Sequence, residues 1–194
     1  MTVINELEPL LSPIAAIQKL IEHFDDQGIV IGGVAASILG KPRLTADADA
    51  MLLLSIEDVP QLVELAEKVG LTPRLPDVVE FAQRSRVVLL EHQATGINVD
   101  ISLGLLPFEI EAVERSQNHQ IGTISVRLPT PEDLIILKAV ANRPKDLLDI
   151  AAVISSNPNL DQNRIALWVR QFAELLEAPE LWLEVEKLLQ DVSQ

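Results

Sequence analysis

The chain has no cysteine and no tyrosine, and only 3% of its 194 residues are aromatic. Without cysteine there is no disulfide framework, no thiolate zinc site and no cysteine nucleophile. So few aromatic side chains do not provide a surface on which nucleic-acid bases stack. Basic residues are also scarce, at 15 against 29 acidic ones, and the formal charge is −14. This charge disfavours bulk binding to DNA or to anionic lipid.

Long apolar runs are absent as well. No stretch approaches the roughly 18 apolar residues of a membrane span, and the first sixteen residues carry two glutamates and no basic segment typical of a signal peptide. We therefore expect a cytoplasmic protein without a membrane partner. The chain does have length and apolar content, since 48% of its residues are hydrophobic. That is enough for one compact domain with a sizeable core.

The pattern of apolar residues predicts strands and helices in mixed order, followed by helices alone. Ser12 and Pro13 look like the start of a first helix that ends before Gly28. Apolar runs predict strands at 29–31, 47–54, 84–90, 97–103 and 123–128, and further helices at 34–39, 57–69 and 108–116. From Thr130 and Pro131, which resemble a helix cap, every segment has helical spacing. We therefore divide the chain into a core at 1–129 and a helical region at 130–194.

Two aspartates lie two residues apart in the predicted strand 47–54, whose sequence DADAMLLL is otherwise apolar. Alternate side chains of a strand face the same way, so Asp47 and Asp49 lie together. Two carboxylates about 4 Å apart repel by roughly 4 kcal/mol at an effective dielectric constant near 20, and a hard divalent metal is an economical counter-charge. Asp100 lies in a second apolar strand and would join them if the strands are neighbours. Alternatively, the pair is a set of solubility charges at a strand edge and Asp100 caps a turn.

A glycine pair, Gly32 and Gly33, follows the short strand at 29–31 and precedes the helix at 34–39. Glycines in this position let a phosphate approach the backbone closely, and the amides of the following helix are available as donors. Alone, such a pair is more often a simple turn.

Together these residues resemble the signature of the nucleotidyltransferase superfamily, which is a hydrophobic residue, Gly-Gly or Gly-Ser, a gap, and then Asp-x-Asp. The residues on that pattern are Ile31, Gly32, Gly33, Asp47 and Asp49, and Asp100 resembles the third carboxylate. The segment GGVAASILGKPRLTADADAML is similar to the AbiEii/AbiGii-type nucleotidyltransferases, which are often toxins of toxin–antitoxin pairs. Gly40, Arg43 and Thr45 fall on this version too.

A second block, PTPEDLIILKAVANRPKDLLDIAAVI, resembles the later motif of the same family. There a helix lysine precedes an Arg-x-Lys-Asp-x-x-Asp stretch, and the matching residues are Lys138, Arg143, Lys145, Asp146 and Asp149. The two blocks stand in the correct order and cover residues 29–154, which leaves the last 40 residues without a counterpart.

The resemblance implies an α+β nucleotidyltransferase fold, with a mixed β-sheet flanked by helices. It implies Mg²⁺ or Mn²⁺ on Asp47, Asp49 and Asp100, and an NTP whose triphosphate lies against the glycine pair. Lys138 would pair with the triphosphate and Asp146 would orient Lys138 or the acceptor. The reaction would be transfer of NMP to an acceptor, with RNA (tRNA among them), protein and small molecules all open, and a cognate antitoxin is an expected partner.

Several alternatives stay open from the sequence. Lys138 could be a solvated helix lysine, Asp149 a surface charge and Arg43 a solvated loop arginine. The whole chain could be a non-catalytic module of the same fold that binds a nucleotide or a protein, although retention of all three aspartates argues against this. It could also be an interaction protein whose acidic helical tail, from about residue 160, docks a basic partner. Trp168 and Trp182 lie on apolar helix faces and are expected to pack.

Overall fold

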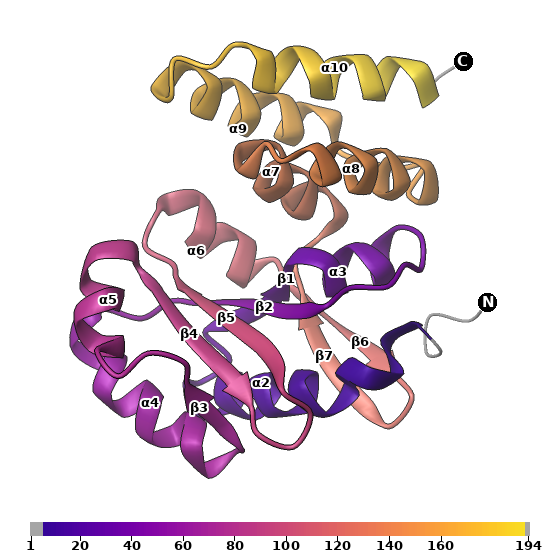
Figure 1. Ribbon diagram of the computed structural model, residues 1–194. Coiled ribbons are helices and arrows are strands. Elements are labelled where there is room, and N and C mark those ends of the chain that lie inside the picture. The colour runs from indigo at the N-terminus through magenta and orange to yellow at the C-terminus, as the bar shows by residue number, and fades with distance from the viewer. Residues whose placement is uncertain (1–5, 193–194) are drawn as a thin grey trace.

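The computed structural model describes residues 6–192, so the outermost residues of the two predicted regions, 1–5 and 193–194, lie outside it. The centre of the molecule is a five-stranded sheet (Figure 1). Its strands are β1 (Gly28–Ile31), β2 (Asp47–Leu52), β3 (Leu71–Pro73), β4 (Val87–His92) and β5 (Ile97–Leu103), in the order β1-β2-β5-β4-β3. Only β2 and β5 run parallel to each other, and the remaining pairs of this sheet are antiparallel. The predicted mixed sheet is confirmed.

Helices pack against this sheet on both sides. They are α2 (Leu11–His23), α3 (Gly32–Leu39), α4 (Val59–Lys68), α5 (Val78–Ser85) and α6 (Pro107–Glu114), with 3₁₀ turns η1 (Glu8–Leu10) and η2 (Ile56–Asp58). Helix α2 packs against α4, β1 and β2, whereas α3 packs between these two strands and the helices of the C-terminal region. A separate hairpin of β6 (Gln117–Ile121) and β7 (Ile124–Leu128) lies against α2 and β1.

Beyond residue 130 the chain is helical, as predicted. The helices are α7 (Pro131–Ala141), α8 (Pro144–Ser156), α9 (Gln162–Leu175) and α10 (Glu180–Val192), and they form one end of the molecule (Figure 1). Helix α7 begins where the Thr130 side chain accepts a hydrogen bond from the Asp133 amide, with proline at the first helical position. Buried apolar side chains before and after residue 129 form one continuous core.

Several local predictions differ from the structure. The sequence did not indicate β3, α5 or β6. The strand expected at 84–90 begins only at Val87, because α5 continues to Ser85 and ends where Arg86 adopts a left-handed φ of 56°. The first helix begins at Leu11 rather than at a Ser12 cap, since the 3₁₀ turn before it leads directly into the helix. Strand β6 has the polar sequence QNHQI, which lacks an apolar signal.

No helix within residues 6–192 is both long and apolar enough to cross a membrane.

Candidate active site

The parallel pairing of β2 with β5 brings the three predicted aspartates onto one face of the sheet. Asp49 is directly opposite Asp100, and Asp47 is opposite Asn98. Paired residues of neighbouring strands, and alternate residues of one strand, face the same side. The carboxylates of Asp47, Asp49 and Asp100, called the aspartate triad below, therefore gather on the two strands at the middle of the sheet. Asp100 lies within β5, so the alternative that it caps a turn is wrong.

Mutual repulsion and burial both act on the triad. Burial, together with the charges of Asp47 and Asp100, raises the pKa of Asp49 to about 6, although Arg143 and Lys145 oppose the increase. Burial also raises the pKa of Asp100, against the lowering effect of nearby Arg74. A cation placed among these oxygens would relieve the repulsion.

Each carboxylate of the triad has different neighbours. The Thr45 hydroxyl donates to Asp47 Oδ1 at 3.1 Å, and Arg74 Nη2 donates to Asp100 Oδ1. Asp49 accepts no hydrogen bond from any residue that the structure describes. The donor chemistry of three carboxylates suits a hard divalent cation. No three His, Asp or Glu side chains in residues 6–192 are placed so that they could hold an ion as they stand.

The two glycines are required because β2 passes directly against the start of α3. Gly32 has φ of 65°, and a Cβ there would lie 1.9 Å from Asp49 Oδ2. A Cβ on Gly33 would lie 2.4 Å from the Thr45 hydroxyl oxygen. Helix α3 begins at Gly32, so its free N-terminal amides lie beside the triad. Such amides are suited to bind phosphate oxygens.

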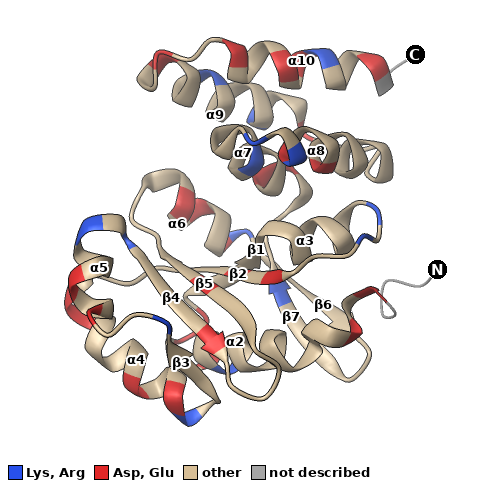
Figure 2. Ribbon diagram, viewed as in Figure 1, with Lys and Arg blue, Asp and Glu red and all other residues tan. Residues whose placement is uncertain are grey.

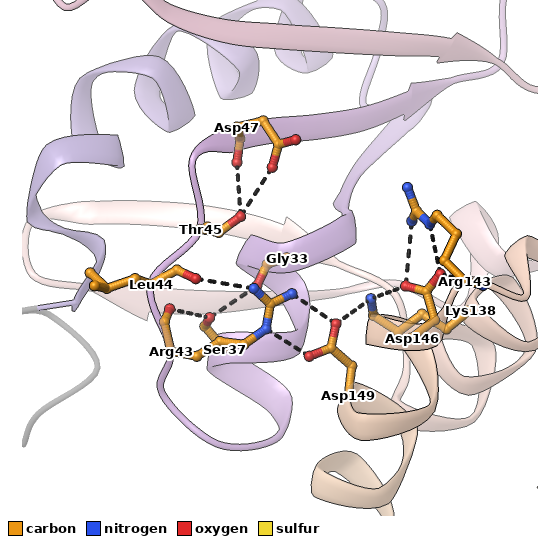
Figure 3. A network of polar contacts seen from close by, with 10 residues as sticks. All are labelled: Gly33, Ser37, Arg43, Leu44, Thr45, Asp47, Lys138, Arg143, Asp146 and Asp149. Atoms are coloured by element: carbon orange, nitrogen blue, oxygen red, sulfur yellow. Dashed lines mark hydrogen bonds and ion pairs between the residues drawn. The ribbon is translucent and has the colours of Figure 1, made fainter.

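A buried ionic network, shown in Figure 3, lies next to the triad and consists of Arg43, Lys138, Arg143, Asp146 and Asp149. Lys138 is only 3% exposed, and its Nζ lies 3.0 Å from Asp146 Oδ1 and 2.6 Å from Asp149 Oδ2. Arg43 Nε donates to Asp149 Oδ1 at 2.7 Å, and Arg43 Nη2 donates to Asp149 Oδ2 at 2.8 Å. Arg143 Nε donates to Asp146 at 2.7 Å. The network thus ties the segment before β2 to helices α7 and α8.

Burial alone would raise the pKa of Asp146 and Asp149. Hydrogen bonds from their cationic partners outweigh this effect, so the net pKa of each carboxyl is lowered. Three cations face two carboxylates, which leaves one surplus positive charge. The alternatives of a solvated Lys138, a surface Asp149 and a solvated Arg43 are wrong, because these side chains hold one another in place.

A cavity of about 390 Å³ is lined by Asp49 of the triad and by Lys138 and Arg143 of the ionic network. Its polar lining comes from Gly32, Asp49, Ser102, Lys138 and Arg143, and Ile31, Leu134, Leu137 and Ala141 supply its apolar lining. Arg143 is the accessible cation of this set, since its side chain is 53% exposed. The cavity joins the residues of both sequence blocks, which are about a hundred positions apart.

The sequence did not single out two residues of this region. Ser37 donates to the carbonyl oxygens of Gly33 and Arg43, at 2.9 and 3.0 Å, and so connects α3 to the segment before β2. Arg74 reaches Asp100 from beyond β3. Arg74 could be found only from the strand order, because nothing in the local sequence marks it.

The two tryptophans pack between helices, as expected. Trp168 lies against Phe108 and Phe172, with ring centroids 5.3 and 6.0 Å apart. Trp182 lies beneath the Arg170 guanidinium, at 4.5 Å from its ring centroid.

Two solved structures share the overall architecture. The antibiotic-resistance factor ANT(2'')-Ia has a TM-score of 0.55 and 16% identity, over 87% of this chain and 95% of that one. A nucleotidyltransferase-like protein from Paracoccidioides brasiliensis, described as antigenic, has a TM-score of 0.53 and 16% identity, over 94% and 93%. At these identities the likeness establishes the fold, and the predicted nucleotidyltransferase fold is confirmed.

No curated protein matches the chain. A family model described as "Nucleotidyltransferase of unknown function (DUF6036)" matches residues 8–165. This match covers the sheet, the aspartate triad, the glycine pair and the ionic network, which is well over half of the chain. The protein therefore belongs to this nucleotidyltransferase family.

Proposed function

We propose that the protein transfers a nucleoside monophosphate from an NTP to an acceptor, with Mg²⁺ or Mn²⁺ held by Asp47, Asp49 and Asp100. One observation carries the proposal. The parallel register sets Asp49 opposite Asp100, directly beside a Gly32 that has no room for a side chain. Carboxylates for a cation and the N-terminal amides of α3 therefore lie at one place.

The remaining residues of the site have roles that follow from their positions. A bound divalent cation would neutralise charge on the attacking and leaving oxygens. The amides at the start of α3 would bind triphosphate oxygens over Gly32 and Gly33, with Thr45 supporting this turn. In the proposed reaction an acceptor oxygen forms a bond to the α-phosphorus, the bond to pyrophosphate breaks, and Asp100 takes the proton of the acceptor.

The geometry favours a different phosphate-binding residue from Lys138, which the resemblance implies. Lys138 faces the cavity, but its ammonium group is shared between Asp146 and Asp149. Arg143 faces the same cavity and is half exposed, so we assign the direct phosphate contact to Arg143. Lys138, Asp146 and Arg43 hold the nucleotide-binding surface in shape. Figure 2 shows Lys and Arg residues close together where α7 meets α8, which is the position that this assignment requires.

The acceptor is open among RNA, protein and small molecules. Excess positive charge favours phosphate binding at the junction of α7 and α8, whereas the chain as a whole carries −14. An RNA acceptor such as tRNA would therefore meet mostly like charge away from the cavity. The rival function, a module that binds a nucleotide without turnover, would keep the cavity but not need the carboxylate of Asp100.

The AbiEii-type resemblance adds an expectation that the fold and family do not address. On this expectation the protein is the toxin of a pair and is neutralised by an antitoxin. The expectation rests on the two sequence blocks alone. Induced expression in a bacterial host, compared with expression of Asp47→Asn, tests it. Growth arrest by the wild-type protein alone supports a toxin, and unimpaired growth with both proteins removes that expectation.

Label transfer tests the proposed activity. The pure protein is incubated with Mg²⁺ or Mn²⁺, with each α-labelled NTP in turn and with total cell extract, and the RNA, protein and small-molecule fractions are then separated. We expect label in one fraction with the wild-type protein and none with Asp47→Asn. Nucleotide binding without label in any fraction would contradict transfer and favour the non-catalytic module.

A further inference from the structure

Arg74 stands at the end of a line of residues that crosses the sheet. Asp49 is opposite Asp100, and Asp100 is opposite Leu89 of β4. The backbone amide of Arg74, directly after β3, donates to the carbonyl oxygen of Leu89 at 3.0 Å. The sheet therefore places the Arg74 backbone two strands from Asp100, with β4 between them, and the guanidinium reaches across β4 to Asp100 Oδ1.

This guanidinium differs from the other cations near the cavity. Arg43, Lys138 and Arg143 are held by Asp146 and Asp149. Within residues 6–192, Arg74 makes the only ion pair to the aspartate triad. Its side chain is 26% exposed, and its buried Nε has no hydrogen-bond partner among the described residues. A single carboxylate therefore holds the guanidinium in place.

We propose that Arg74 is a resident counter-ion of the aspartate triad, which competes with a divalent cation for Asp100. The inference rests on the proposed function, because it assumes that the triad binds the cation. A guanidinium on Asp100 Oδ1 and a metal ion on the same carboxylate would be like charges a few ångströms apart, so each weakens the binding of the other. Arg74 thereby lowers the affinity of the triad for the metal.

The test measures binding of Mn²⁺ alone, by electron paramagnetic resonance of the free ion, without nucleotide or turnover. Arg74→Gln removes the competing charge, and Arg74→Lys keeps it. Arg84→Gln is the matched control, because Arg84 is an exposed arginine of the neighbouring helix α5 that pairs with Asp77. It removes the same formal charge away from the triad. Thermal melts establish that each variant is folded.

We expect Arg74→Gln to bind Mn²⁺ about three- to fivefold more tightly than the wild-type protein, the size of effect that loss of a partly exposed ion pair gives. Arg74→Lys and Arg84→Gln should stay within about twofold of wild type. In the background of Asp100→Asn, the Arg74→Gln effect should disappear.

Two results of the Mn²⁺ titration would overturn the inference, and they differ in what they imply for the proposed function. If the wild-type protein binds Mn²⁺ and Arg74→Gln binds it no more tightly than Arg84→Gln, Arg74 is not a competitor, while the metal site stands. If no variant binds Mn²⁺ at millimolar concentration, the metal assignment itself is wrong. An NMR measurement needs no variant: the Arg74 Nε–H resonance of the wild-type protein should shift on addition of Mg²⁺. An unshifted resonance at a Mg²⁺ concentration that saturates the site would also contradict competition between Arg74 and the cation.

Discussion

Lys138 and Asp149 form an ion pair that is almost completely buried, with Nζ 2.6 Å from Oδ2. Asp149 also accepts both hydrogen bonds of the Arg43 fork. The pair therefore connects α7, α8 and the segment that leads into the aspartate strand. An arrangement of this kind makes the shape of the cavity beside the aspartate triad depend on buried charges from three separate segments.

Replacement of Lys138 by methionine should destabilise the fold. The variant leaves two buried carboxylates with fewer partners, and removal of one member of a buried ion pair costs about 3 kcal/mol. Urea denaturation measures the change. Lys145→Met is the control, because Lys145 is exposed on α8 and should change the free energy of unfolding by less than about 0.5 kcal/mol. Equal stability of Lys138→Met and the wild-type protein would show that the buried pair does not support the fold.

Arg43→Lys tests whether the bidentate geometry matters beyond the charge. Lysine retains the positive charge but cannot hold both oxygens of Asp149, so we expect a loss of about 1 kcal/mol. Hydrogen exchange of residues 41–46 should also become faster. Arg84→Lys serves as the comparison, since Arg84 makes a single 3.8 Å ion pair to Asp77 and is largely exposed. Unchanged exchange at 41–46 would mean that the fork does not fix this segment.

Gly32→Ala should disable the site by moving Asp49. The added Cβ would lie 1.9 Å from Asp49 Oδ2, and the backbone is left-handed at this position. Gly70→Ala is a matched control, because Gly70 also has positive φ, at 85°, but has nothing within 4 Å of its added Cβ. Both variants should lose about 1 kcal/mol or more to backbone strain. Only Gly32→Ala should also lose metal-dependent NTP binding, and normal binding by this variant would argue against the site.

The sequence led to most of this site because each of its parts has a local signal. Asp47 and Asp49 stand out as charges in an apolar strand, and Gly32 and Gly33 as a pair between a strand and a helix. That Asp100 meets Asp49 depends on the parallel pairing of two strands about fifty residues apart, which no local pattern contains. The resemblance supplied that pairing before the structure did.

Other parts of the fold could not be predicted, for physical reasons. Strand β6 is polar because the hairpin that it forms with β7 leaves most of its side chains accessible. Strand β3 is only three residues long at the edge of the sheet, too short for an alternating pattern. The contact between Arg74 and Asp100 requires that β3 be placed beside β4, so it follows from tertiary structure alone.

The metal-free protein should lose stability as the pH rises from about 4 to about 6. Burial, with the charges of Asp47 and Asp100, raises the pKa of Asp49 from 3.8 to about 6, although Arg143 and Lys145 oppose the increase. The folded protein therefore binds this proton more tightly than the unfolded chain, and the free energy of unfolding falls between these values. Over this window the fall is at most about 3 kcal/mol.

Asp49→Asn should remove that loss. Denaturation at pH 4.0 and pH 7.0 measures it, in chelator and without added metal. The variant should be more stable than the wild-type protein at pH 7.0, and the difference should shrink at pH 4.0. If the free energy of unfolding of both proteins depends on pH in the same way, repulsion within the triad does not raise the pKa of Asp49.

Calorimetric titration with each common NTP, in Mg²⁺ and in chelator, tests the central claim most directly. The wild-type protein should bind at least one NTP with an affinity that depends on Mg²⁺. Asp47→Asn and Asp49→Asn should weaken this binding at least about tenfold while they remain folded, because each removes a charged oxygen donor for the cation. Unchanged Mg²⁺-dependent affinity in both variants would contradict the assignment of the aspartate triad as the metal and nucleotide site.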